Sequence, residues 1–302
     1  MRVLIVGLGS IARKHIAALR ELRPDAEVIA LRSTSALPEA GVQNICNLDE
    51  LAAQPDFAII SNPTRYHINA IKDAVALRCP LFIEKPVLSS LEDIETANDL
   101  DLHAIPTYIA CNLRFHPCVK YLKDHLSVTE SKINEVNIYC GSDLSSWRPG
   151  QDYSNSYSAK AAMGGGVHLD LIHEIDYCYW LFGKPDAVRS TKRKVSGLLI
   201  DSFDFAAFQL NYPRFTANII LNYYRPTPMR RAELVLNNSV LIMDLLSATI
   251  TRNDQLIYQA QDFKMADTYS SQMAYFLEHM ELKQQMMNTF DEASEVLKIA
   301  LA

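Results

Sequence analysis

The chain has 302 residues, of which 49% are hydrophobic and 21% are charged, and its formal net charge at pH 7 is −6. This composition supports a large core and about two domains, and it lacks the basic surface that nucleic-acid binding needs. The first apolar run is broken by Gly7 and is too short to cross a membrane, and no cleavable leader is recognisable. We therefore expect a cytoplasmic globular protein with neither nucleic-acid nor membrane partners.

Six cysteines are scattered along the chain without a C-x-x-C pair. This spacing favours neither a zinc site nor a disulfide framework, so we expect reduced and mostly buried thiols. Histidines and carboxylates at metal-ligand spacing do not occur outside residues 168–176, and we expect no bound metal.

From residue 1 to about residue 118, short β-rich runs alternate with helical periods. This alternation is typical of parallel strands joined by crossover helices, and it predicts a first domain over 1–118. The predicted strands span residues 2–6, 27–31, 57–61, 81–83 and 108–111. The predicted helices span residues 11–22, 47–53, 66–76 and 91–100, the last of them with Ser89 and Ser90 as candidate caps.

Residues 119–302 follow a different pattern, in which short strands are joined by turns such as Tyr212-Pro213 and Asn237-Asn238. This pattern indicates an α+β domain with a large, mainly antiparallel open sheet. The predicted strands span residues 133–140, 187–195, 203–211, 216–224, 232–236, 240–245, 249–252 and 255–258. The predicted helices span residues 117–126, 167–181 and 269–301. The last helix carries an apolar stripe that we expect to pack in a core, and packing back on the first domain is a further option.

A glycine-rich turn follows the first predicted strand and opens the first predicted helix. Gly7 suits the tight turn, Gly9 lets the backbone approach a pyrophosphate, and the amide groups of Ser10 and Ile11 begin the helix beside it. Ala12 replaces the third glycine of the motif and allows close packing of helix and strand. The order of strand, turn and helix predicts a dinucleotide-binding loop.

The end of the second predicted strand indicates which dinucleotide is bound. An NAD site commonly places an acidic residue there to hold the ribose 2′-hydroxyl, whereas this chain has Arg32, Ser33 and Thr34. Arg32 can pair with a 2′-phosphate, and the two hydroxyls can donate to it. We therefore expect NADP in preference to NAD. The alternative is that Arg32 is simply a solvent-facing residue at the strand end.

Three polar segments follow the third, fourth and fifth predicted strands, where an open α/β sheet binds its ligands. Glu84-Lys85-Pro86 places a lysine that can stabilise an alkoxide or move a proton. The segment after the third strand contains Asn62, Pro63 and His67, and the segment after the fifth contains Asn112 and Arg114.

Together with the run 164–176, these segments resemble the glucose-fructose oxidoreductase and inositol dehydrogenase family, known as Gfo/Idh/MocA. The resemblance covers nearly the whole chain and implies an amino-terminal doubly wound Rossmann domain, a second domain with an open sheet, and a homodimer or homotetramer formed through that sheet. It also implies a cis peptide before Pro86, a nicotinamide over that segment, and a substrate held against Lys85 and the helix that carries His173. The cofactor set that we expect comprises Gly7, Gly9, Ser10, Ile11, Arg32, Ser33, Thr34, Asn62, Pro63, His67, Glu84, Lys85 and Asn112.

Asp170, His173 and Asp176 are spaced by three residues, which places them on one broad face of a helix. Asp170 can therefore orient His173, whose ordinary pKa suits proton exchange with a hydroxyl. Family members usually space the acid and the histidine by four, and here that position is Leu169, so the role of Asp170 is open. His168 is the less well oriented alternative.

The loop before this helix combines aromatic, hydroxyl and cationic side chains, which suit a polyhydroxylated ligand. It resembles the loop of family members associated with surface-polysaccharide and acidic-sugar pathways, and it can equally form an oligomer contact. The substrate set that we expect comprises Arg114, Trp147, Arg148, Tyr153, Tyr157, Lys160, Asp170 and His173.

We therefore expect reversible hydride transfer between a nicotinamide and the hydroxyl or carbonyl carbon of a sugar or nucleotide sugar, with Lys85, His173 and Asp170 as the catalytic residues. Two alternatives stay open. One is a dinucleotide- and sugar-sensing regulator or scaffold of the same fold. The other is an aldehyde or imine reductase that resembles a bile-pigment reductase.

Overall fold

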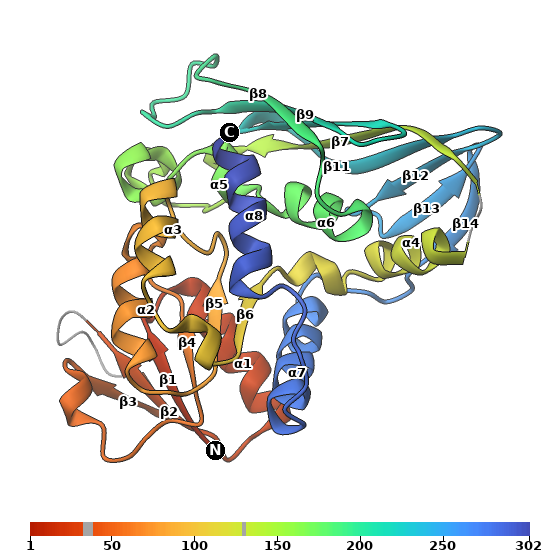
Figure 1. Cartoon of the computed structure of the whole chain (residues 1–302). Helices are drawn as coiled ribbons and strands as arrows, with labels where there is room; N and C mark the ends of the chain where they lie inside the picture. The colour runs from red at the N-terminus through yellow and green to blue at the C-terminus, as the bar shows by residue number, and fades with distance from the viewer. Residues whose placement is uncertain (33–38, 129–130) are drawn as a thin grey trace. The chain divides into compact units, whose positions relative to one another are not determined.

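The computed structural model describes residues 1–32, 39–128 and 131–302. The chain divides into two compact units. The first unit comprises Met1–Asn112 and Met265–Ser294, and the second comprises Leu113–Lys264 and Glu295–Ala302. The first unit thus includes a late segment of the chain, whereas both predicted domains are continuous. Each unit is built around one sheet (Figure 1).

The first unit contains a six-stranded parallel sheet in the order β3-β2-β1-β4-β5-β6. The strands are β1 (Arg2–Val6), β2 (Glu27–Leu31), β3 (Val42–Ile45), β4 (Phe57–Ile60), β5 (Leu81–Glu84) and β6 (Thr107–Ala110). The strands β4 and β5 are buried along their whole length, as expected for parallel strands covered on both faces. The strand order reverses between β1 and β4, so the ligand-binding crevice of such a sheet lies at the carboxyl ends of these two strands.

Helices cover both faces of this sheet. The helices are α1 (Ser10–Leu22), α2 (His67–Val75), α3 (Leu91–Asn98) and α7 (Asp267–Glu281). Figure 1 shows α2 and α3 on one face and α1 and α7 on the other. Phe276 of α7 packs edge-on against Phe57 and Phe82, and the predicted core role of this apolar stripe is confirmed by the burial of Met273, Phe276 and Leu277.

A segment that follows α7 occupies the outer edge of β6. The backbone N–H of Ile109 donates to the carbonyl oxygen of Asn288 at 2.9 Å, and the side-chain amide of Asn288 donates to the carbonyl oxygen of Ile109 at 2.7 Å. Asn288 has a φ of +52°, a left-handed conformation that asparagine tolerates better than most residues. Phe290 donates its N–H to the hydroxyl of Thr107 at 3.1 Å. The edge strand is thereby hydrogen-bonded to its own chain.

The second unit contains an eight-stranded sheet in the order β14-β13-β12-β11-β7-β10-β9-β8. The strands are β7 (Ile133–Asp143), β8 (Ala187–Arg193), β9 (Phe205–Asn211), β10 (Thr216–Asn222), β11 (Tyr224–Leu236), β12 (Val240–Asp244), β13 (Thr249–Arg252) and β14 (Gln255–Gln259). The pair β7–β10 is parallel and the other pairs are antiparallel, which confirms the predicted mainly antiparallel sheet. The pairing of β7 with β11 is irregular between Tyr224 and Met229.

Three helices, α4 (Pro117–Val128), α5 (Val167–Asp170) and α6 (His173–Phe182), lie along one face of the second sheet (Figure 1). In β9 and β10, buried residues alternate with half-buried or exposed ones, as expected for a sheet with one open face. The helix α8 (Phe290–Leu301) ends in this unit, where the Lys192 amine donates to the carbonyl oxygen of Leu301 at 2.7 Å.

Most predicted elements exist, and four predictions are wrong in detail. The strand β3 was not predicted, and the predicted helix 47–53 is reduced to the short 3-10 turn Leu48–Glu50. The predicted helix 269–301 is two helices, α7 and α8, and the predicted helix 167–181 is interrupted between α5 and α6. All six cysteines are free thiols, and five of them are buried.

Candidate functional site

Gly7 makes a turn that no other residue could make without strain. Its φ is +87°, and a Cβ atom at this position would lie 2.6 Å from the Cα atom of Asn62. Its N–H donates to the carbonyl oxygen of Leu31 at 3.1 Å, and its own carbonyl accepts from the Ser61 hydroxyl at 2.9 Å. The turn is therefore pressed against the end of β4, and glycine is required by both conformation and space.

The start of α1 is open, in contrast to the crowded turn before it. Gly9 is the N-cap residue, and a Cβ built on it would meet no atom of the described residues within 4 Å. Gly9 has no side chain that could cap the helix, so the first amide groups, beginning with Ser10 and Ile11, receive no cap from the N-cap residue. Ala12 is fully buried, which allows the helix to pack closely on its strand. This arrangement fits a bound pyrophosphate.

Arg32 follows the last residue of β2, as predicted. Its backbone N–H donates to the carbonyl oxygen of Ile45 at 3.0 Å, and its guanidinium lies 3.5 Å from the side-chain oxygen of Asn44. Ser33 and Thr34, the other two predicted phosphate contacts, lie outside the described residues.

His67 links two of the predicted ligand-binding segments. Its Nε2 lies 2.9 Å from the carbonyl oxygen of Asn62, and its Nδ1 lies 3.1 Å from the carbonyl oxygen of Val87. Burial lowers the pKa of His67, and a neutral ring has one N–H to share between the two carbonyls. The ring therefore holds the turn after β4, which contains Pro63, against the segment after β5. Both ring nitrogens of His67 are therefore used in backbone contacts within the fold.

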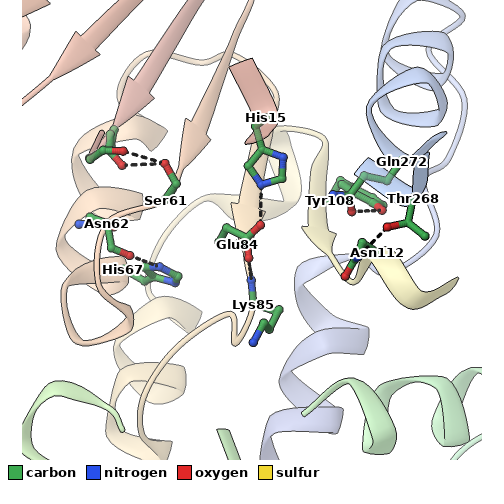
Figure 2. A network of polar contacts seen from close by, with 12 residues as sticks. His15, Ser61, Asn62, His67, Glu84, Lys85, Tyr108, Asn112, Thr268 and Gln272 are labelled. Atoms are coloured by element: carbon green, nitrogen blue, oxygen red, sulfur yellow. Dashed lines mark hydrogen bonds and ion pairs between the residues drawn. The ribbon is translucent and has the colours of Figure 1, made fainter. Parts of the chain in front are cut away.

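Lys85 directly follows β5 and is joined to Pro86 by a cis peptide bond, as the family resemblance implies. Its backbone N–H donates to Oε2 of Glu84 at 3.1 Å, and Oε1 of Glu84 lies 2.5 Å from Nε2 of His15 (Figure 2). The Glu84 carboxylate, which we expected to contact the cofactor, is thus occupied within the fold. The carboxyl ends of β1, β4 and β5 bring Lys85 to the same edge of the sheet as the glycine turn.

Asn112 lies just beyond β6 and is buried. Its side-chain amide donates to the hydroxyl of Thr268 at 2.7 Å (Figure 2). The hydroxyl of Thr268 donates to the carbonyl oxygen of Met265 at 2.6 Å. The predicted cofactor residue therefore ties the end of β6 to the first turn of α7.

A pocket of about 290 Å³ in the second unit brings together three of the predicted catalytic and substrate residues, Trp147, Asp170 and His173. Its wall is completed by β7, by β11 next to its irregular pairing with β7, and by Leu246. Irregular pairing of this kind is common beside active sites because it redirects side chains. The pocket combines a carboxylate, an imidazole, an indole and Arg230 with apolar residues, as expected of a site that binds a small polar molecule.

Asp170 and His173 do not lie on one continuous helix, so the predicted common face is wrong for Asp170, whereas His173 and Asp176 both lie on α6. Asp170 ends α5 and His173 begins α6, and the backbone between them leaves the helical conformation at Leu171. The hydroxyl of Tyr223 donates to Oδ2 of Asp170 at 2.5 Å. A three-residue spacing cannot reveal an interruption of this kind, because the apolar pattern continues through it.

Arg114 and Asp176 form a buried two-point ion pair, with Nε–Oδ2 and Nη2–Oδ1 distances of 2.9 and 2.7 Å. Their side chains are 0% and 1% exposed. The predicted substrate contact of Arg114 is therefore replaced by a structural one, since its charge is neutralised inside the fold. Arg114 is not among the residues that we propose to touch substrate.

The predicted substrate loop makes contacts within itself and with neighbouring segments of the chain. The indole N–H of Trp147 donates to the Ser142 hydroxyl at 2.8 Å, and the Arg148 guanidinium lies 5.3 Å from the ring centre of Tyr157. The negative charge of the Asp170 carboxylate raises the pKa of Tyr157. The Tyr153 hydroxyl accepts the N–H of Leu199 at 3.2 Å.

Lys160 and His168 have contrasting environments. Lys160 is exposed in the same loop. His168, the alternative to His173, is buried edge-on against Phe203, and burial lowers its pKa to about 4. It does not line the pocket that contains His173.

In the part of the chain that the structure describes, no helix has both the length and the apolar character needed to span a membrane.

Comparison with known proteins identifies the family. A model described as "Oxidoreductase family, NAD-binding Rossmann fold" matches residues 1–101, and one described as "GFO/IDH/MocA C-terminal domain" matches residues 131–240. This chain belongs to the Gfo/Idh/MocA oxidoreductase family.

Gfo/Idh/MocA relatives share modest sequence identity with this chain. Rhizopine catabolism protein MocA of Rhizobium meliloti is 27% identical over 61% of this chain and 57% of its own length. D-glucoside 3-dehydrogenase of Escherichia coli K12 is 28% identical over 63% of this chain and 56% of its own length. The chain thus matches somewhat over half the length of these curated relatives. The structure of UDP-N-acetylglucosamine 3-dehydrogenase GnnA from Acidithiobacillus ferrooxidans has a TM-score of 0.78 at 20% identity, covering 100% of this chain and 95% of that one.

Two residues at the candidate sites of this Gfo/Idh/MocA chain were not predicted from sequence. His15 lies in an amphipathic helix where it reads as one of the polar positions, and Tyr223 lies in a strand-like run of alternating residues. Their partners are 69 and 53 residues away along the chain. No local spacing signals contacts of this range.

Proposed function

We propose that this chain is a nicotinamide-dependent dehydrogenase that acts on a hydroxyl or carbonyl carbon of a sugar or nucleotide sugar. The observation that carries the proposal is the position of Lys85, at the carboxyl end of β5 and on the sheet edge that also holds the glycine turn. The names of two relatives support the substrate class, because both describe dehydrogenases that act at position 3 of a hexose derivative.

The residues around the glycine turn fit a dinucleotide. The open space beside Gly9 accommodates the pyrophosphate, and the amide groups at the start of α1 supply donors to it. When bound, the nicotinamide takes or returns the hydride. Asn62, Pro63 and His67 shape the neighbouring turn, and Asn112 braces the end of β6.

We propose NADP as the preferred cofactor, with NAD as a weaker one. The support is the absence of an acidic side chain at the end of β2, where Arg32 lies instead. A guanidinium in this place pairs well with a 2′-phosphate. Affinities for NADPH and NADH should therefore differ in the wild type, and Arg32→Ala should weaken NADPH selectively. Equal NADPH affinity in the two proteins would remove Arg32 from the proposal.

For the oxidation direction, we propose that His173 accepts the hydroxyl proton while Lys85 stabilises the developing alkoxide. Asp170 contributes a fixed negative charge to the pocket that contains His173, and Tyr223 holds that carboxylate by a hydrogen bond. Trp147, Arg148, Tyr153, Tyr157 and Lys160 belong to the loop that we propose to bind the sugar. In the reversed assignment Lys85 accepts the proton. In that case the fall in rate at acidic pH should persist in His173→Asn.

The test is a screen of NADP reduction with sugars and nucleotide sugars, and of NADPH oxidation with oxidised sugars. Lys85→Met should abolish turnover and leave cofactor affinity nearly intact, because the amine acts on the reacting oxygen. Lys72→Met, an exposed lysine of α2, is the matched control and should behave as wild type. Normal turnover by Lys85→Met would refute the proposed site.

We also propose a homodimer or homotetramer that forms through the open face of the second sheet. The support is the alternation in β9 and β10, which leaves Ile220 38% exposed on that sheet. Light scattering on wild type and Ile220→Lys should show dissociation in the variant. The cytoplasmic location and a place in surface-polysaccharide or acidic-sugar metabolism stay predictions.

A further inference from the structure

His15 and Glu84 form a buried pair that connects the cofactor helix to the Lys85 backbone. His15 lies on α1 and is 0% exposed, and Glu84 ends β5 and is 7% exposed. Nε2 of His15 lies 2.5 Å from Oε1 of Glu84, and Oε2 of Glu84 accepts the Lys85 N–H at 3.1 Å. Figure 2 shows the three groups in one line, with the carboxylate in the centre. One carboxylate therefore has a donor on each oxygen.

Aromatic contacts hold the His15 ring in this orientation. The ring packs edge-on against Phe82 at 4.8 Å and Tyr269 at 5.8 Å between ring centres. Nδ1 of His15 is buried and has no hydrogen-bond partner among the described residues. We therefore assign the proton to Nε2, because this tautomer donates to the carboxylate and leaves only a lone pair unpaired.

The burial of Glu84 makes both donors important. A carboxylate that leaves water loses strong hydration and must recover it from hydrogen bonds within the protein. Hydrogen bonds to an ionised acceptor are about twice as strong as neutral ones. A carboxylate that loses one of its two donors is left buried without full compensation, and this favours its displacement from the remaining donor. The pair is thus suited to fixing the backbone at the point where Lys85 begins.

We propose that His15 and Glu84 are positioning residues that hold the Lys85 backbone, and with it the Lys85 amine, in place for the transfer step. This inference rests on the proposed function of Lys85. Neither His15 nor Glu84 touches the reacting atoms in this proposal. They act through the peptide N–H of Lys85, since that group is the one that the carboxylate binds.

Hydrogen exchange of the Lys85 amide tests the positioning without any substrate. Pro86 has no amide hydrogen, so few other amides contribute to the exchange signal of a short peptide that spans this segment and contains Lys85. Exchange should rise by about tenfold or more in Glu84→Leu and His15→Phe, which remove the acceptor or the first donor. His15→Gln retains an N–H donor at this position, and it should restore most of the protection. His103→Phe, at a side chain that is 84% exposed, is the control.

Single-turnover hydride transfer tests the consequence for catalysis. His15→Phe should lower the transfer rate by about tenfold or more, because small displacements of a catalytic group are costly. The dissociation constant of the cofactor should change by less than about threefold, and His15→Gln should recover most of the rate. Urea unfolding curves establish that each measured variant is folded.

Several results would overturn the inference. Full protection of the Lys85 amide in Glu84→Leu would show that the carboxylate does not hold it. A normal transfer rate in folded His15→Phe, with only a reduced free energy of unfolding, would leave the pair a purely structural one. An equal rate loss in His15→Gln and His15→Phe would also contradict it. Normal turnover by Lys85→Met would instead refute the proposed function, whatever the exchange data show.

Discussion

The phenolic oxygen of Tyr223 lies 2.5 Å from Oδ2 of Asp170, and both side chains are buried. Burial, and then the negative charge of Asp170, raises the pKa of Tyr223 well above its ordinary range. The hydroxyl therefore keeps its proton at every pH at which the enzyme would work, and it supplies Asp170 with a constant donor. Asp170 is in this way held at the wall of the pocket that also contains His173.

Removing this donor should impair both catalysis and folding. Tyr223→Phe leaves the Asp170 carboxylate buried with one hydrogen bond fewer, so we expect the free energy of unfolding to fall by about 1–3 kcal/mol. We expect kcat to fall by about tenfold, because Asp170 loses its fixed orientation. Tyr224→Phe, at the half-buried neighbour, should change neither quantity measurably. Unchanged kcat in Tyr223→Phe would show that Asp170 does not depend on the phenol.

Two glycines of one turn should respond differently to the same substitution. Gly7→Ala places a Cβ 2.6 Å from the Cα atom of Asn62 at a φ of +87°, so we expect a large loss of stability. In Gly9→Ala the new methyl group meets no atom within 4 Å in the part of the chain that the structure describes, so the protein should fold normally. Its methyl group enters the space that we assign to the pyrophosphate, and the dissociation constant of the cofactor should rise by at least about tenfold. Thermal unfolding and cofactor fluorescence measure the two effects. Normal cofactor affinity in Gly9→Ala would place the pyrophosphate elsewhere.

His116 should make the stability of the protein depend on pH. Its Nε2 donates to the carbonyl oxygen of Leu245 at 3.2 Å, and its Nδ1 accepts the N–H of Cys118 at 3.2 Å. This neutral form is fully hydrogen-bonded, and burial lowers the pKa of the ring from 6.5 to about 4. Because the folded pKa lies below the unfolded one, the contribution to stability is complete above pH 6.5 and is lost as the pH falls towards 4.

Urea unfolding of wild type and His116→Gln at several pH values isolates this contribution. Glutamine does not titrate, so the difference in unfolding free energy between the two proteins should shrink by about 3 kcal/mol between pH 7 and pH 4. In the control variant His103→Gln, at an exposed side chain, the free energy of unfolding should change with pH as it does in the wild type. A constant difference across this range would mean that His116 titrates normally in the folded protein.

The ion pair of Arg114 and Asp176 should be structural rather than catalytic. Asp176→Asn leaves a buried guanidinium without its counter-charge, and we expect a loss of about 3–5 kcal/mol in the free energy of unfolding. The double variant Arg114→Met, Asp176→Leu removes both charges and should recover much of that loss. Denaturant unfolding of the single and double variants gives the coupling between the two residues. Wild-type stability in Asp176→Asn would contradict the role that we assign.

The sheet of the first unit could be predicted well because its strands are buried on both faces. The apolar runs of β1 and β2 have the same bounds in prediction and structure. The strand β3 lies at the edge of the sheet, and its sequence VQNI has two adjacent polar residues between two apolar ones, so it shows neither an apolar run nor an alternation. The segment between α7 and α8 contains neither proline nor glycine, the residues that usually mark a helix end. The chain turns there at Lys283 and Asn288, which have a positive φ that their residue types do not predict.

The candidate site could be predicted in part, for a related reason. Lys85, Asp170 and His173 stand out because motifs and strand ends are local features of the chain. The contacts that hold them are non-local: His15 reaches Glu84 across 69 positions, and Tyr223 reaches Asp170 across 53. Arg114 shows the converse error, because a charged residue beside a motif suggested ligand binding while its counter-charge lay 62 positions away. Residue spacing in the sequence identifies neighbours along one helix or strand. Contacts between residues that are far apart in the sequence are seen only in the folded chain.

The two hydrogen bonds between Ile109 and Asn288 affect how copies of this protein can associate. The outer edge of β6 is a place where a β-strand from a second molecule could add to the sheet and begin an aggregate. The backbone N–H and carbonyl of Ile109 are both already hydrogen-bonded to Asn288. The N–H of Phe290 donates to the hydroxyl of Thr107, two residues earlier in the strand. The chain thereby protects its own sheet from intermolecular strand addition with a single asparagine in place of a seventh strand.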